Sequence, residues 1–218
     1  HQLAPKSPAY NLVYSARITP AIDIEAMKAA FQSLYERHPM LDVTFHTKDG
    51  EPYQKVHRGR TVDFREHDAT HLDEDGVKAL VVDAANQPFD LEKGPVVRLE
   101  IFRTQDGADI TVLSMHHIIS DAWSITVSMN DLIESYFARR MGKTPEWHEI
   151  AARYSDFQAW EQIHLEGESG QRMHDYWMDH LGDAPLTLDL PTDRPRPAVQ
   201  TFNGGALGFK LDEELTGQ

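Results

Sequence analysis

One segment near the middle of the chain constrains the fold most, because a strand pattern passes there directly into a helix pattern. Residues 109–114 (DITVLS) are β-branched and apolar, as in a strand that is buried in a sheet. Residues 123–140 follow with amphipathic helical spacing. A buried strand followed directly by an amphipathic helix indicates a sheet with helices packed on it.

The rest of the chain alternates between the same two patterns. Other strands are predicted at residues 9–19, 41–47, 52–57, 62–66, 96–103 and 206–211, and the strand from 109 is expected to run on to 117. Helices are predicted at residues 23–37, 72–87, 153–166 and 170–181, the first two capped by Asp23 and Asp73. Because hairpins and helices are mixed, we predict an α+β fold, a two-layer sandwich with a mixed sheet and helices packed on it.

The helix predicted over 153–166 has an aromatic face. Tyr154, Phe157, Trp160 and His164 recur every three or four residues. This spacing predicts that the four side chains pack into the core.

Two adjacent histidines and an aspartate lie where the strand from 109 meets the following helix. Histidine is the side chain best suited to moving a proton near neutral pH, so His116 and His117 are the candidate chemical groups. Strand side chains alternate between faces, so the two rings are expected to point in opposite directions. That geometry argues against both rings binding one metal ion, and no metal site is predicted.

Each of these residues also has a purely structural interpretation. A histidine at a strand end is often only a hydrogen-bonded structural residue. Asp121 is placed to orient the histidines, and it is equally suited to cap the helix that follows it. The residues alone leave both interpretations open.

Composition excludes several classes of function. The 218 residues carry a formal net charge of −14, which disfavours nucleic acid and anionic membranes as partners. The chain has no cysteine, so it has no disulfides, no zinc–thiolate site and no cysteine nucleophile. No apolar run is long enough for a transmembrane helix. A cytoplasmic location is expected.

Several motifs in register resemble the condensation domains of nonribosomal peptide synthetases. Residues 115–124 (MHHIISDAWS) resemble the family's HHxxxDG motif. Five further segments resemble other motifs of the family and follow in the family's order: SPAYN at 7–11, RHPML at 37–41, PFDL at 88–91, YSDFQAW at 154–160 and LPTDRPRP at 190–197. The resemblance runs from about residue 6 to residue 211 and implies the chloramphenicol-acetyltransferase-like fold.

The chain departs from the family pattern at two positions near the motif. The usual glycine after the motif aspartate is Ala122, and the second arginine of the family's RHExLR block is Asp42. In relatives that arginine can belong to the polar network around the motif. Arg37, which matches the first arginine of that block, is retained. We expect Asp121 to hold the loop through hydrogen bonds with an arginine.

The resemblance implies amide-bond formation between two carrier-bound substrates. An upstream peptidyl carrier protein presents an acyl or peptidyl thioester on a phosphopantetheine arm, and a downstream carrier presents the attacking amine. No cofactor is expected to bind the chain directly. His117 is assigned to the amine, as general base or as positioning group, His116 to a structural role and Asp121 to the loop.

The family's opening motif and its second lobe have no counterpart in residues 1–218. The chain is therefore expected to be the N-terminal lobe of a longer domain, cut at both ends and nearly inactive alone. Its partners would be the carriers, the C-terminal lobe and an adjacent adenylation domain. Three alternatives remain: an epimerization domain, another HHxxxD acyltransferase, and a non-catalytic lobe that docks carriers.

Overall fold

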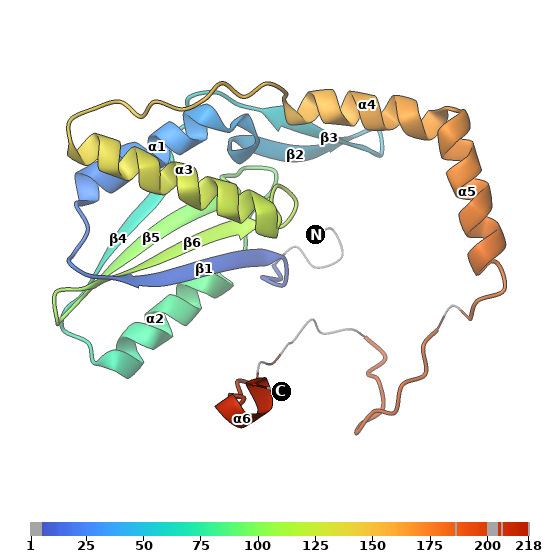
Figure 1. The fold of residues 1–218 in the computed structure, drawn as a ribbon. Coiled ribbons are helices and arrows are strands. Elements are labelled where there is room, and N and C mark those ends of the chain that lie inside the picture. Colours follow the sequence, from blue (N-terminus) through green and yellow to red (C-terminus); the bar gives the residue numbers. More distant parts are fainter. Residues whose placement is uncertain (1–5, 186, 200–204, 206, 218) are drawn as a thin grey trace. The chain divides into compact units, whose positions relative to one another are not determined.

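The computed structural model describes residues 6–185, 187–199, 205 and 207–217 (Figure 1). The chain divides into two compact units, His1–Ile163 and His164–Gln218. All six strands among the described residues belong to the first unit.

A four-stranded sheet with the order β1–β6–β5–β4 forms the centre of the first unit (Figure 1). The strands are β1 (Asn11–Ile18), β4 (Asp63–Ala69), β5 (Val97–Thr104) and β6 (Asp109–His116). β6 pairs antiparallel with both β1 and β5, whereas β4 and β5 run parallel. The sheet is mixed, as predicted from the sequence.

A separate hairpin joins β2 (Val43–Lys48) to β3 (Glu51–Val56). Its two turn residues, Asp49 and Gly50, both have positive φ angles, 54° and 87°. Such turns match the twist of paired strands and favour glycine and aspartate. The strands predicted at 41–47 and 52–57 are confirmed, and they pair as a hairpin.

Helices cover both faces of the sheet. α1 (Ile24–Arg37) and α3 (Ala122–Arg140) lie on one face, and α2 (Glu74–Asn86) lies on the other (Figure 1). Asp23 caps α1 by accepting from the Ala26 amide, and Asp73 caps α2 by accepting from the Gly76 amide. Both predicted caps are confirmed. A short 3-10 turn, η1 (Pro39–Leu41), follows α1.

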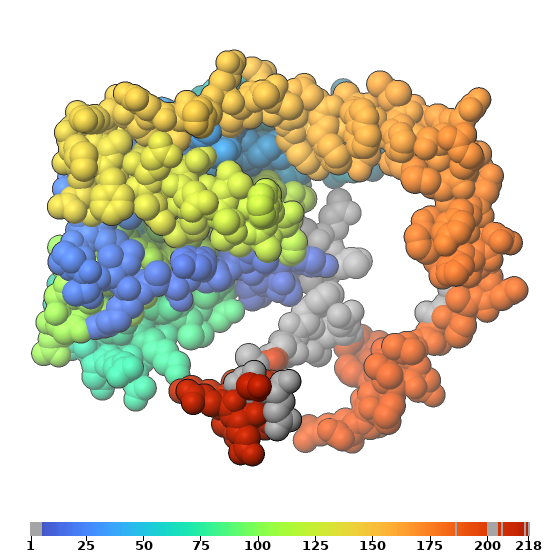
Figure 2. All heavy atoms as spheres, in the orientation of Figure 1, coloured from blue at the N-terminus to red at the C-terminus, as the bar shows by residue number. Residues whose placement is uncertain are grey.

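The two sheet faces draw on alternate residues of the same strands. On the side of α1 and α3 the core includes Phe31, Leu34, Val97, Leu99, Ile101, Leu113 and Met115, all nearly inaccessible. On the side of α2, Phe102 and Val112 pack against Ala84. The outer side chains of α3, in yellow-green, form part of the visible surface in Figure 2, and Trp123 on this helix is 76% exposed.

The prediction that the aromatic face of the 153–166 helix packs in the core is wrong for its three aromatic rings. α4 (Tyr154–Glu166) has no buried residue. Tyr154, Phe157 and Trp160 are 46–58% exposed and contact one another, with ring centres 5.8–5.9 Å apart. Helical spacing identifies the face that is apolar, but it does not supply a surface to cover that face.

The described part of the second unit contains α5 (Glu168–Leu181) and α6 (Glu213–Thr216). The strand predicted over 206–211 is not seen, since residues 207–211 lie in no helix or strand. Residue 206 lies outside the described residues. The alternating apolar pattern is present, but a strand also needs a hydrogen-bonded neighbour. None of the helices that the structure describes is long and apolar enough to cross a bilayer.

Candidate functional site

The predicted site residues occupy the turn that connects β6 to α3. His116 is the last residue of β6, and Asp121 is the N-cap of α3. The turn is closed by hydrogen bonds from the Ile119 amide, at 3.1 Å, and the Ser120 hydroxyl, at 3.1 Å, to the His116 carbonyl. His117 therefore lies on a short segment that is fixed at both ends.

His116 is buried within this turn. Its Nδ1 accepts a hydrogen bond from the Ile118 amide at 3.0 Å. Phe89 lies edge-on to the ring, with centres 6.3 Å apart. Burial lowers the pKa of His116 to about 4, so the ring is neutral at physiological pH and its proton lies on Nε2. These contacts support the structural role expected for His116.

His117 is exposed, in contrast to its neighbour. Its amide donates to the Tyr10 carbonyl at 2.8 Å, and its ring Nδ1 lies 2.8 Å from the Ser120 carbonyl. A carbonyl oxygen only accepts, so Nδ1 bears the proton. In the neutral ring, Nε2 is then left with a lone pair, which is the form that can accept a proton or a hydrogen bond.

Asp121 is exposed and bonds locally. Its Oδ1 accepts from both the amide and the hydroxyl of Ser124, each at 2.7 Å. These hydrogen bonds lower the pKa of the Asp121 carboxyl below its usual value. The helix-cap interpretation is confirmed, and the expected arginine partner is not seen among the described residues. The reason is local: the cap geometry already directs the carboxylate at Ser124.

The two arginine-related positions of the family pattern have partners of their own. Asp42 is buried and accepts from Arg60 Nε at 2.5 Å. Arg37 donates to Asp131 at 2.8 Å and stacks over the Trp147 ring at 4.9 Å. The charge-reversed residue at position 42 is thus neutralised by Arg60.

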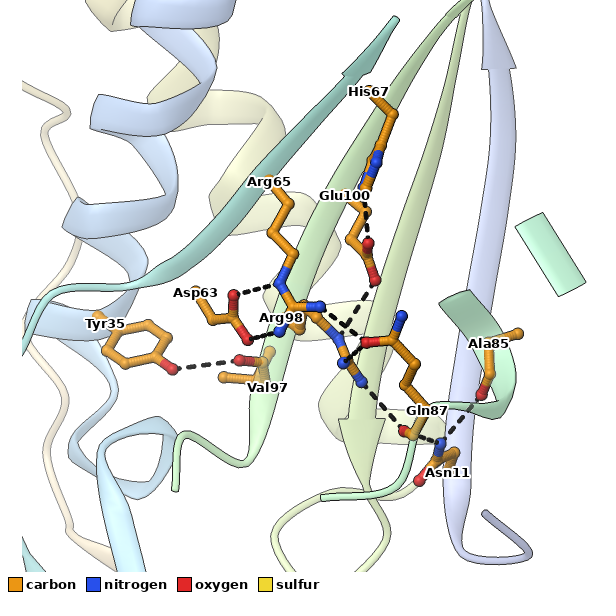
Figure 3. A network of polar contacts seen from close by, with 10 residues as sticks. All are labelled: Asn11, Tyr35, Asp63, Arg65, His67, Ala85, Gln87, Val97, Arg98 and Glu100. Carbon is orange, nitrogen blue, oxygen red and sulfur yellow. Dashed lines mark hydrogen bonds and ion pairs between the residues drawn. The ribbon is translucent and has the colours of Figure 1, made fainter. Parts of the chain in front are cut away.

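A buried polar network on the α2 face was missed by sequence reasoning (Figure 3). Arg98 and Glu100 of β5 are 3% and 1% exposed, and Arg98 Nε lies 3.3 Å from Glu100 Oε1. Arg98 also donates to the Gln87 side chain at 2.6 Å. The signal was present in the sequence, because Arg98 and Glu100 alternate with the apolar residues Val97, Leu99 and Ile101 along one strand.

A cavity of about 1000 Å³ lies beside the C-terminal end of α1. Five arginines line it, at positions 37, 58, 60, 139 and 153. None of the three motif residues lines this cavity. Over the described part of the chain, no cluster of histidine and acidic side chains is arranged to hold a metal ion.

Comparison with known sequences gives a consistent result. The family model of the condensation domain matches residues 1–218. A linear gramicidin synthase protein of Brevibacillus parabrevis is 35% identical over 98% of this chain and 3% of that protein. Phosphinothricin tripeptide synthetase PhsC of Streptomyces viridochromogenes is 33% identical over 99% of this chain and 20% of that protein. The chain spans a small fraction of these relatives.

Solved structures agree with this match. The X-domain from teicoplanin biosynthesis, solved in complex with OxyB, gives a TM-score of 0.81 at 29% identity over 89% of this chain and 43% of that chain. The epimerization domain of the third module of tyrocidine synthetase B gives 0.77 at 22% identity over 88% and 44%. Together with the mixed sheet and its helices, these likenesses confirm the predicted chloramphenicol-acetyltransferase-like fold.

Proposed function

The chain belongs to the condensation-domain family, and from this premise we propose that it forms amide bonds in nonribosomal peptide biosynthesis. The observation that carries the proposal is the state of His117. Its ring is exposed, and Nδ1–H is bound to Ser120, which leaves Nε2 as an acceptor. An acceptor nitrogen on a fixed turn is suited to a substrate amine.

The proposed reaction joins two substrates on the phosphopantetheine arms of carrier proteins. The amine of the downstream aminoacyl group attacks the carbonyl carbon of the upstream thioester. The C–N bond forms, the C–S bond breaks, and the sulfur leaves as a thiol after taking up the proton that the amine loses. His117 Nε2 accepts the hydrogen bond of that amine, and His116 and Asp121 hold the turn.

The magnitudes favour positioning as the main source of rate. Holding two tethered reactants together supplies about 7–11 kcal/mol in favourable cases. General-base assistance adds about 10²–10⁴-fold. A thioester is already activated, so His117 acts on a reaction that needs alignment more than strong base catalysis.

We further propose that residues 1–218 are the N-terminal lobe of a longer cytoplasmic domain, next to a C-terminal lobe and an adenylation domain. The 43% coverage of the X-domain chain supports this division. The two carriers would reach the site from opposite sides. This chain alone should then be nearly inactive, and efficient condensation by it would contradict the proposal.

A second candidate is a non-catalytic lobe that docks a partner protein. Asp42 and Ala122 depart from the family pattern, and the X-domain likeness is to a protein solved in complex with OxyB. Under this hypothesis the motif is scaffolding. Carrier binding would persist without any dependence of product on His117.

The deciding experiment uses the intact synthetase with loaded donor and acceptor carriers, with product on the acceptor followed by mass spectrometry. His117→Ala is expected to lower the rate about 100-fold, equivalent to about 2.7 kcal/mol. His117→Asn is the matched variant, because its side-chain amide can still donate to the Ser120 carbonyl while Nε2 is lost. An unchanged rate in both folded variants, with carriers bound, would favour the docking hypothesis.

A further inference from the structure

The start of β1 and the end of α2 are tied together by one side chain. Asn11 Nδ2 donates to the carbonyls of Ala85 and Gln87, both at 2.9 Å (Figure 3). The last carbonyls of a helix have no partner inside it, and Pro88 has no amide to continue the pattern. Asn11 therefore uses both of its N–H groups to hold the C-terminal end of α2.

Gln87 is in turn fixed by two guanidinium groups. Its side-chain oxygen accepts from Arg98 at 2.6 Å and from Arg65 at 2.7 Å, and its main-chain carbonyl accepts from Arg98 at 3.1 Å. Glu100 compensates the charge of Arg98, and Asp63 compensates that of Arg65. Each cation therefore has a carboxylate, so the two can share one amide oxygen.

This assembly contacts both histidines through neighbours in sequence. The Tyr10 carbonyl, next to Asn11, accepts the amide of His117 at 2.8 Å. Phe89 follows Gln87 by two residues and lies edge-on to His116, while the Arg98 guanidinium lies over the Phe89 ring at 4.8 Å. A shift of Asn11 or Gln87 is therefore passed to the turn on which His117 lies.

We propose that Asn11 is a positioning residue for His117, held in place by the end of α2 and the Arg98–Gln87 contact. Asn11 does not touch substrate. It fixes the Tyr10 carbonyl, which accepts the His117 amide. In this way it determines the position of the His117 ring. The kinetic part of this inference rests on the proposed function, whereas the geometric part does not.

The main test is Asn11→Asp in the intact synthetase. The nearly isosteric carboxylate directs oxygens at the Ala85 and Gln87 carbonyls, so repulsion displaces the start of β1. We expect kcat to fall on the order of 10²-fold with KM for both carriers unchanged, as for a misplaced catalytic group. Hydrogen–deuterium exchange read by mass spectrometry should show faster exchange at the His117 amide.

Two controls separate positioning from general loosening. Asn86→Asp makes the same chemical change at the same helix end, but within the described part of the chain the Asn86 side chain donates to the Val82 carbonyl of its own helix and to no other element. It should leave both readouts near the wild type. Gln87→Met removes the acceptor of the two arginines and should lower kcat. Gln87→Glu retains an acceptor and should recover most of that loss in kcat.

The outcomes are distinct. Wild-type kcat and exchange in Asn11→Asp would overturn the inference, and so would an equal effect of Asn86→Asp. If the wild type forms no amide, the proposed function fails, and exchange at His117 alone decides. Faster exchange in Asn11→Asp but not in Asn86→Asp would then support positioning, and equal exchange would overturn it.

Discussion

The two faces of the four-stranded sheet are built from alternate residues of the same strands, yet they differ in kind. From β5, Val97, Leu99 and Ile101 enter an apolar core under α1 and α3. The residues between them, Arg98 and Glu100, enter a buried ion pair and an amide network on the α2 face. One strand thus supports a non-directional core on one side and a directional network on the other.

The two faces contribute differently: the apolar face mainly stabilises the fold, and the polar face mainly fixes the position of the site. Apolar burial stabilises in proportion to the buried area and has no preferred direction. Hydrogen bonds have short ranges and preferred angles, so the polar face fixes where its members stand. The motif turn is linked to this network by two contacts: the His117 amide donates to the carbonyl of Tyr10, the residue before Asn11, and His116 packs against Phe89, whose ring lies beneath the Arg98 guanidinium.

The largest effect is expected from the apolar face. Phe31 of α1 is completely buried in the core between this helix and the sheet. Phe31→Ala should lower the free energy of unfolding by about 3–5 kcal/mol, through lost burial and the cavity left behind. Equilibrium denaturation measures this loss. A loss below about 1 kcal/mol would mean that this core is not the main source of stability.

A smaller loss of stability is expected from the polar face, and a second substitution should partly reverse it. Arg98→Met leaves Glu100 buried with His67 as its remaining partner, at 2.8 Å. The free energy of unfolding should fall by about 3 kcal/mol, because the buried carboxylate loses the cation of its ion pair. Adding Glu100→Leu should recover part of the stability. A double variant that is as unstable as the sum of both losses would contradict an interaction between the pair.

The smallest effect concerns pH and His116. Its pKa is lowered from 6.5 to about 4 in the folded chain. The unfolded chain therefore binds the proton first as pH falls, and stability decreases from about pH 6.5 until it levels off below pH 4. Between pH 7 and pH 5 the loss should be about 2 kcal/mol.

The matched control for this prediction is His116→Asn. Its side-chain oxygen can accept the Ile118 amide, as Nδ1 does in the native residue, but it does not titrate. Denaturation curves at several pH values should show a flatter dependence for the variant. Equal slopes in the two proteins would show that His116 is not the titrating group.

The sequence by itself determined those features that depend on residues close together in the chain. Asp23, Asp73 and Asp121 each cap a helix by binding an amide three residues ahead. The hairpin turn at Asp49 and Gly50 is local in the same way, and so is the strand from Asp109, which was expected to reach residue 117 and ends one residue earlier, at His116. Such features follow from side-chain period and short-range hydrogen bonds, so a single sequence contains the information.

Only the tertiary structure decided what meets across long separations. Asn11 reaches Gln87 from 76 residues away, and Asp42 finds Arg60 from 18 residues away. Neither pairing follows from the residue types, because strand order and register set which side chains face each other. The exposure of the α4 aromatics has the same origin: periodicity defines an apolar face, and the arrangement of the other elements decides whether it is covered.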